Sequence, residues 1–231
     1  AVAALALRRG GPGGPLEEDD HLRLSRLAIR LLHTPLPADG PQAAYLFQEL
    51  DCNVPSVVQA ALEVRRQRPG VVLFTVGVDN GRLGLPIASG YGAAPYLLEQ
   101  LRDAGLDVAE VELADFDHSG QINTLNESEA FVRHARRRGW TSVAVLAPAF
   151  HLLRASLTAG SVARREYPEL RLHPVAGAPL PWHEAAQHSQ GALGTRADFI
   201  DAELGRIARY TAKGDILPWR ELETFFAACE R

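Results

Sequence analysis

His151 and Arg154 are the two residues whose types and spacing point most directly to chemistry. They are three residues apart, so on a helix they share one face. A histidine titrates near neutral pH and can transfer a proton, and an arginine can hold a carboxylate or a phosphate through paired hydrogen bonds. We therefore expect His151 to shuttle a proton or donate a hydrogen bond and Arg154 to hold an anion. The alternative is a surface histidine beside a salt-bridging arginine.

The segment from Asn123 to Glu127 combines a helix start with two asparagines. Thr124 and Glu127 have the spacing of a capping box, in which each side chain bonds a backbone amide of the other residue. This pattern accounts for Thr124 and Glu127. It does not account for Asn123 or Asn126, which have low helix propensity. We therefore expect the two asparagines to orient a ligand.

Further polar residues follow two predicted strands. Asp51 and Asn53 come after the first of them, and a glycine-rich segment follows the second. The candidates in that segment are Gly77, Asp79, Asn80 and Arg82. Glycines let the backbone approach a ligand closely, but the segment is neither GxGxxG nor a phosphate loop with GK[ST], so a long turn is an equal alternative. Asp51 or Asp79 could bind the hydroxyls of a ribose, as acidic residues do in related folds.

Metal chemistry is a weaker alternative. Asp115, Asp117 and His118 could hold a metal ion for a hydrolase, but their spacing does not enforce a site, and solvated loop residues are the simpler interpretation. His183 and His188 resemble a zinc-protease motif only superficially, because the second histidine comes one residue too late. We assign no metal ligands. The sequence also lacks the GxSxG elbow of the usual α/β hydrolases.

Strands and helices alternate along the chain, and this pattern predicts the fold. Val71 to Val76 and Ser142 to Ala147 are uninterrupted apolar runs, which are typical of strands covered on both faces. The other predicted strands are 43–50, 108–113 and 170–175. The predicted helices are 16–33, 55–67, 93–104, 124–138, 149–165, 195–212 and 218–228. Because the connections are too long for hairpins, we expect an α/β fold: a Rossmann-like, doubly wound, mostly parallel five-stranded sheet with helices on both faces. Ligands of such sheets bind beyond the carboxyl ends of the strands, where all the candidate residues lie.

Composition limits the function classes. The chain has 231 residues, with 24 basic and 28 acidic ones and a net charge of −4, which argues against a general nucleic-acid binder. Two cysteines form no disulfide framework, so a reducing cytoplasm fits best. Residues 1–15 are predicted to be a flexible leader before a single domain over 16–231. The apolar stretch Ala1–Leu7 is too short to cross a membrane, and its arginines follow it rather than precede it, so we expect neither a signal peptide nor a membrane partner.

Four segments of the chain resemble the YdcF-like (SanA/ElyC/YdcF) family. They are ELDCNVPSVVQAALEV, INTLNESEAF, AVLAPAFHLLRA and LGRIARYTAKGDILPW. The second is similar to an NTxEN motif and the third to a strand that ends in a histidine and an arginine–alanine pair. The Glu–Asn order of the family appears here as Asn126–Glu127, and its glycine-rich first loop is replaced by Asp51-Cys52-Asn53.

The resemblance implies a Rossmann-like fold with a pocket at the strand ends. It also implies a nucleotide-derived ligand, S-adenosylmethionine among the possibilities, and adds Thr124 and Glu127 to the ligand-binding residues. The leading hypothesis is therefore a small-molecule-binding protein, and more specifically an enzyme acting on a nucleotide-derived or other anionic ligand. The rival hypothesis is a regulatory or assembly protein whose crevice binds a metabolite without catalysis.

Overall fold

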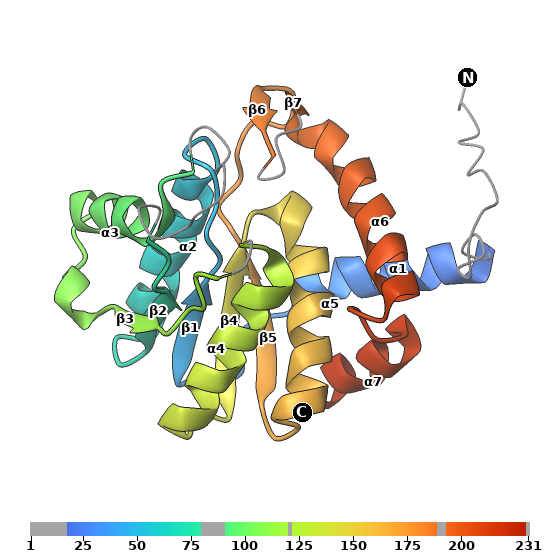
Figure 1. Ribbon diagram of the computed structural model, residues 1–231, viewed down its shortest axis with the longest axis horizontal. Helices are drawn as coiled ribbons and strands as arrows, with labels where there is room; N and C mark the ends of the chain where they lie inside the picture. Colours follow the sequence, from blue (N-terminus) through green and yellow to red (C-terminus); the bar gives the residue numbers. More distant parts are fainter. Residues whose placement is uncertain (1–17, 80–90, 120–121, 189–192, 230–231) are drawn as a thin grey trace.

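A five-stranded parallel sheet forms the centre of the molecule, which is known from a computed structural model (Figure 1). The structure describes residues 18–79, 91–119, 122–188 and 193–229. The strands of this sheet are β1 (Ala43–Leu46), β2 (Val72–Val76), β3 (Glu112–Ala114), β4 (Ser142–Ala147) and β5 (Arg171–Ala176). Their order in the sheet is β3-β2-β1-β4-β5, and every neighbouring pair is parallel. The predicted α/β, doubly wound fold is therefore confirmed.

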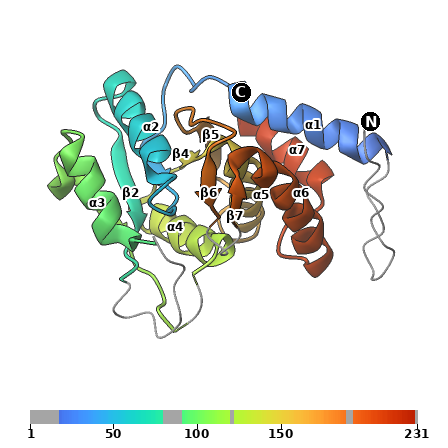
Figure 2. The same ribbon diagram turned by 90° about the horizontal axis from the view of Figure 1, so that it is seen from above.

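Helices cover both faces of this sheet, as the apolar runs of its central strands require. The helices are α1 (Glu18–His33), α2 (Val54–Gln67), α3 (Ala93–Asp103), α4 (Thr124–Arg138), α5 (Ala149–Glu166), α6 (Arg196–Lys213) and α7 (Trp219–Cys229). Tyr45 and Val145 pack into the core beneath α4 and α5, whereas their neighbours Leu46 and Leu146 pack against α2. Successive strand residues thus point to opposite faces, and the two groups of helices lie on opposite sides of the strands (Figure 2).

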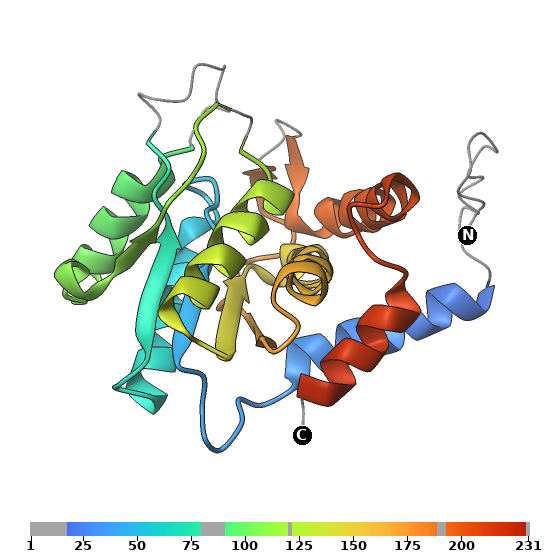
Figure 3. The ribbon, with the colours of Figure 1, turned by 60° about the horizontal axis from the view of Figure 1, so that its bottom comes forward.

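The first and last helices lie together beside the edge strand β5 (Figure 3). Leu31 of α1 and Phe226 of α7 both pack in the main core, and Arg23 lies over the ring of Trp219. The long helix α6 packs along α5. The C-terminal part of the chain is therefore attached to the sheet through α5 and β5.

Three features differ from the expectation. The strand β1 ends at Leu46, although the predicted strand continued to Leu50. The predicted strand 108–113 begins as a short 3₁₀ helix, Val108–Glu110, because the Asp107 side chain accepts a hydrogen bond from the Ala109 amide and caps a turn there. The strand β3 therefore starts later, at Glu112. An antiparallel hairpin of β6 (Ala185–Gln187) and β7 (Leu193–Thr195) precedes α6 and was not expected. The predicted leader, residues 1–15, lies outside the described residues.

Within the described part of the chain, no helix is both long enough and apolar enough to cross a membrane. Among the described residues, Cys52 is partly buried, Cys229 is buried, and neither forms a disulfide bond.

The strand order reverses direction between β1 and β4. From β1 the chain proceeds to β2 and β3 on one side, and then returns to place β4 and β5 on the other. In open parallel sheets this reversal splays the connecting loops apart at the carboxyl ends of the two strands, and ligands bind there. The residues that directly follow β1 and β4 are therefore the first place to look for a site.

Candidate functional site

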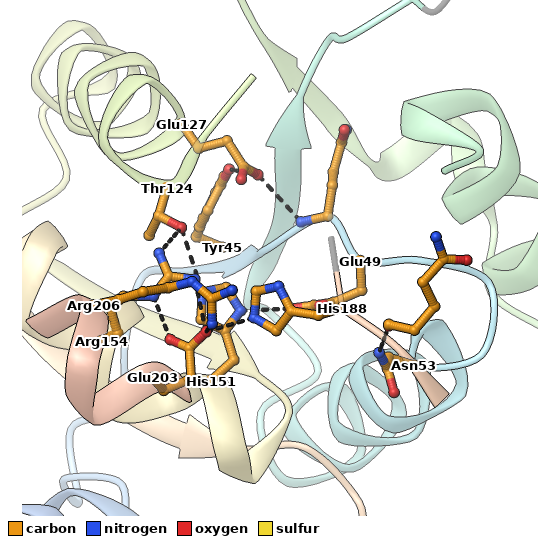
Figure 4. A network of polar contacts seen from close by, with 12 residues as sticks. Tyr45, Glu49, Asn53, Thr124, Glu127, His151, Arg154, His188, Glu203 and Arg206 are labelled. Carbon is orange, nitrogen blue, oxygen red and sulfur yellow. Dashed lines mark hydrogen bonds and ion pairs between the residues drawn. The ribbon is translucent and has the colours of Figure 1, made fainter. Parts of the chain in front are cut away.

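Glu49 and His151 bridge this switch point. Glu49 follows β1, and the Phe47 amide donates to the Leu146 carbonyl, which continues the β1–β4 pairing and fixes the course of the chain. His151 lies in the first turn of α5, which begins directly after β4. The two residues are each 5 % exposed, and Nδ1 of His151 lies 2.5 Å from Oε1 of Glu49 (Figure 4). A buried histidine–carboxyl pair therefore connects the two central strands.

Thr124 meets the other side of the same imidazole. It is the first residue of α4, and its Oγ1 lies 3.4 Å from Nε2 of His151. The same oxygen accepts a hydrogen bond of 2.5 Å from Nη1 of Arg154. Because His151 and Arg154 are one turn apart on α5, both reach this hydroxyl from a single helix. The prediction that they share a face is confirmed.

Glu203 of α6 binds the remainder of the Arg154 guanidinium. Its two carboxylate oxygens accept from Nε and Nη2 of Arg154, and Oε1 also contacts Nε2 of His188 at 2.5 Å and Nη1 of Arg206 at 3.2 Å. Burial alone would raise the pKa of Glu203, but the hydrogen bond with His188 and the charge of Arg154 outweigh it, and the pKa falls well below its usual range. Glu203 is thus an ionised centre shared by these three side chains.

We call these residues the switch-point cluster: Glu49, Thr124, His151, Arg154, His188, Glu203 and Arg206. They come from the loop after β1, from α4, α5 and α6, and from the end of β6 (Figure 4).

A second buried carboxyl group, Glu127, lies beside the cluster on α4. Its Oε1 accepts from the Tyr45 hydroxyl at 3.1 Å and from the Gln48 amide at 3.2 Å. Burial and, to a smaller extent, the nearby charge of Glu49 outweigh the opposing hydrogen bonds from the Gln48 amide and the Tyr45 hydroxyl, and the pKa of Glu127 rises to about 8. Glu127 is therefore mainly protonated at neutral pH, whereas Glu203 is ionised.

The predicted capping box is wrong, because neither Thr124 nor Glu127 caps the helix. The residue that caps α4 is Asn123, whose side chain accepts from the amides of Leu125 and Asn126. Thr124 and Glu127 instead turn inward, to Arg154 and to Tyr45 respectively. The reason is position: a residue just before the helix can reach the free amides of its first turn, whereas the first helical residue presents its side chain to the packed neighbours.

Arg154 forms a salt bridge, as the alternative interpretation expected, but it does so in the interior and not at the surface. It is 2 % exposed, and its guanidinium is shared between Glu203 and Thr124. Its proposed contact with an anionic ligand stays a prediction.

Asn53 lies beneath the β6–β7 hairpin. It is 1 % exposed, its Oδ1 accepts from Nε of Arg196, and its Nδ2 donates to the Gln187 carbonyl. Arg196 also donates to the carbonyls of Cys52 and Pro181. The structure thus gives Asn53 a part in holding the hairpin against the start of α2.

The remaining candidates within the described residues have partners outside the switch-point cluster. Asp51 is exposed and accepts from the Cys52 amide, and the Asp79 amide donates to the His118 ring. Gly77 donates to the Ala114 carbonyl, and a Cβ added there would lie 3.3 Å from that oxygen, so close packing against β3 explains the glycine. Asn80 and Arg82 lie outside the described residues. The Asn126 side chain is partly buried beside the α4 cap.

The three residues of the metal alternative do not form a common site. Asp115 pairs with Arg137 at 3.0 Å, Asp117 accepts from the Ser119 amide, and His118 accepts from the Asp79 amide. Across residues 18–79, 91–119, 122–188 and 193–229, no group of three histidine, cysteine, aspartate or glutamate side chains is arranged to hold a metal ion.

Sequence reasoning missed Glu49, His188, Glu203 and Arg206. Glu49 had a detectable signal, since it is a charged residue inside the apolar run that continues β1. His188 and Glu203 gave no local signal. They reach the cluster only because the hairpin and α6 return to the sheet edge.

This arrangement can perform acid–base chemistry. It holds one imidazole between a carboxyl group and a hydroxyl, beside an arginine–glutamate pair whose charges offset each other.

No family model, curated protein or solved structure matches the chain.

Proposed function

We propose that this protein is an enzyme that binds a small molecule at the carboxyl ends of β1 and β4, with His151 as its general acid–base group. The observation that carries the proposal is the buried Glu49–His151 pair, which spans the switch point of the sheet. Parallel sheets bind ligands at this place, and a histidine with an oriented ring is the commonest proton-transfer group of enzymes.

Glu49 supplies what a catalytic histidine needs. A carboxyl group on Nδ1 fixes the orientation of the ring and leaves Nε2 to face the reacting group, and it stabilises the imidazolium that forms during proton transfer. Burial strengthens this interaction, because water screens it less.

We further propose a nucleotide-derived or other anionic ligand, in keeping with a YdcF-like protein. The four segments of the resemblance contribute Glu49, Thr124, His151 and Arg154, and Arg206 to the switch-point cluster. Two guanidinium groups, those of Arg154 and Arg206, share the single carboxylate of Glu203, which favours an anion nearby. S-adenosylmethionine is one member of this ligand class.

A thermal-shift screen with S-adenosylmethionine, nucleotides and sugar phosphates tests the ligand, and turnover assays on each hit test the chemistry. We expect His151→Gln and Glu49→Gln to bind the hit and to lose about 10²-fold or more in turnover. The matched control is His134→Gln, because His134 also contacts a carboxylate, that of Glu112 at 2.9 Å, but at the far end of α4.

Turnover that survives His151→Gln would contradict the acid–base role. Tight binding without turnover in the unaltered protein would favour the metabolite-binding alternative.

A further inference from the structure

The hydrogen-bond geometry points to Thr124 as a nucleophile, in a Thr124–His151–Glu49 triad that cleaves carboxylic esters. The inference rests on the proposed role of His151 and adds to it a covalent step and a substrate class. A triad of this kind is recognised by the mutual geometry and the roles of its three residues. Such triads occur on unrelated folds, with the three residues in any order along the chain.

One assignment of donors and acceptors satisfies all three contacts. A guanidinium can only donate, so the Thr124 oxygen accepts from Nη1 of Arg154. The hydroxyl proton is then free to be donated to Nε2 of His151. In the tautomer that accepts it, the imidazole proton lies on Nδ1 and is donated to Glu49. In this network the hydroxyl donates to the imidazole and the imidazole donates to the carboxylate, which is the order of donors in a catalytic triad.

The surroundings of Thr124 favour loss of its proton. Nη1 of Arg154 directs a positive charge at Oγ1, where negative charge develops as the proton leaves. The position of Thr124 as the first residue of α4 adds the positive end of a helix dipole. The separation of 3.4 Å between Oγ1 and Nε2 is longer than the roughly 2.6–3.2 Å of a working triad, so proton transfer requires these two atoms to approach each other.

The reaction balances without any further reagent. Thr124 Oγ1 attacks the ester carbonyl carbon while its proton passes to Nε2 of His151. The bond to the leaving alcohol then breaks, and that alcohol takes the proton from His151. Water, deprotonated by the same nitrogen, hydrolyses the Thr124 ester and restores the hydroxyl.

A carboxylic ester fits these residues better than a phosphate monoester. Transfer of a phosphoryl group requires cations on the three outer oxygens of the phosphate. In this cluster the carboxylate of Glu203 offsets the charge of one of the two guanidinium groups, so Arg154 and Arg206 together leave less positive charge than a doubly charged phosphate monoester needs.

A fluorophosphonate probe and p-nitrophenyl acetate test the triad in the full chain. Cys52 is free and partly buried, so all measurements are made in a Cys52→Ala background, which removes a competing nucleophile. We expect the probe to label the peptide that contains Thr124, as mapped by mass spectrometry. We expect ester hydrolysis to fall by about 10³-fold in Thr124→Val and to stay within about tenfold in Thr124→Ser.

The outcomes separate this inference from the proposed function. Hydrolysis that is lost in His151→Gln but unchanged in Thr124→Val would overturn the nucleophile and leave the acid–base role intact. A label on any residue other than Thr124, or no label with no hydrolysis, would also overturn it. Because the labelling uses unaltered Thr124, the test holds even if Thr124→Val fails to fold.

Discussion

The carboxyl ends of the parallel strands form one edge of the sheet, the carboxyl edge, and their amino ends form the other, the amino edge. Each of these two edges holds a buried histidine in contact with a hydroxyl. At the carboxyl edge, His151 contacts Thr124 at 3.4 Å, and at the amino edge, His173 contacts Ser142 at 2.9 Å. The second contact is the shorter one. Yet only His151 lies at the switch point of the sheet and contacts a carboxyl group, Glu49, through its other nitrogen.

The electrostatic surroundings of the two edges differ in the same way. Burial, together with the charge of Arg171, lowers the pKa of His173 to about 4, so this ring stays neutral and acts as a structural hydrogen-bonding group. At the carboxyl edge, three acidic side chains, Glu49, Glu127 and Glu203, surround the histidine and arginine groups. The comparison teaches that a histidine–hydroxyl contact indicates a site only where a carboxyl group orients the ring and the fold places it at the ends of the strands.

The largest expected effect is on stability, from breaking the ionic centre of the carboxyl edge. Glu203→Ala leaves the buried Arg154 without its carboxylate, and removing one partner of a buried ion pair costs about 3–5 kcal/mol. Denaturant unfolding measures this loss. The control is Glu63→Ala, which removes a carboxylate from an exposed pair with Arg66 on α2 and should leave the midpoint unchanged. Equal midpoints for the two variants would show that the cluster contributes no stability.

The next effect concerns Glu127 and pH. Its pKa is about 4.5 in an unfolded chain and about 8 in the folded protein, so between these values the folded state alone keeps the proton. Stability therefore declines as pH rises through this window, by up to about 1.4 kcal/mol per pH unit. Glu127→Gln, which resembles the protonated acid, should remove this decline and raise stability at pH 8. An unaltered pH profile in this variant would contradict the buried, protonated assignment.

The amino edge should respond to pH in the opposite direction. The pKa of His173 is about 6.5 unfolded and about 4 folded, so the unfolded state binds the proton first and stability is lost as pH falls through this narrower window. His173→Gln should flatten that acid limb, by up to about 1.4 kcal/mol per pH unit, in unfolding curves measured at a series of pH values. The turnover of any substrate at neutral pH should be the same in His173→Gln as in the unaltered protein. A lower turnover in this variant would contradict the purely structural role of the amino edge.

The smallest expected effect separates the cluster from the other polar residues of the carboxyl edge. Asp115→Asn breaks only an exposed pair with Arg137. We expect no change in melting temperature, in turnover or in the metal content of the purified protein, because exposed pairs contribute little. A bound metal that is lost in this variant would restore the hydrolase alternative.

Much of the fold was predictable because the central strands are buried on both faces. The runs at β2 and β4 contain no charged residue, and glycine ends α4 at Gly139, whose φ of 68° suits that residue. The hairpin was not predictable. Its strands are three residues long and combine alanine, glycine and polar residues, and it is held by Arg196, whose buried contacts lie far away in the sequence.

The site was predictable only where it follows a strand directly. His151 and Arg154 were found because β4 and α5 are unambiguous. Thr124 and Glu127 were assigned to a cap because local spacing cannot tell whether a side chain turns to the helix end or to a packed neighbour. Glu203 lies within a regular amphipathic helix, and only the packing of α6 on α5 gives it a role.

The position of Glu203 in the chain also sets the order in which the cluster can form. All five strands of the parallel sheet leave the ribosome before Glu203 does, because β5 ends at Ala176. Until α6 is synthesised, the guanidinium of Arg154 has no carboxylate to neutralise it in the apolar surroundings of α5. The docking of α6 therefore completes the switch-point cluster, whereas the core is complete only when α7, which follows α6, adds Phe226.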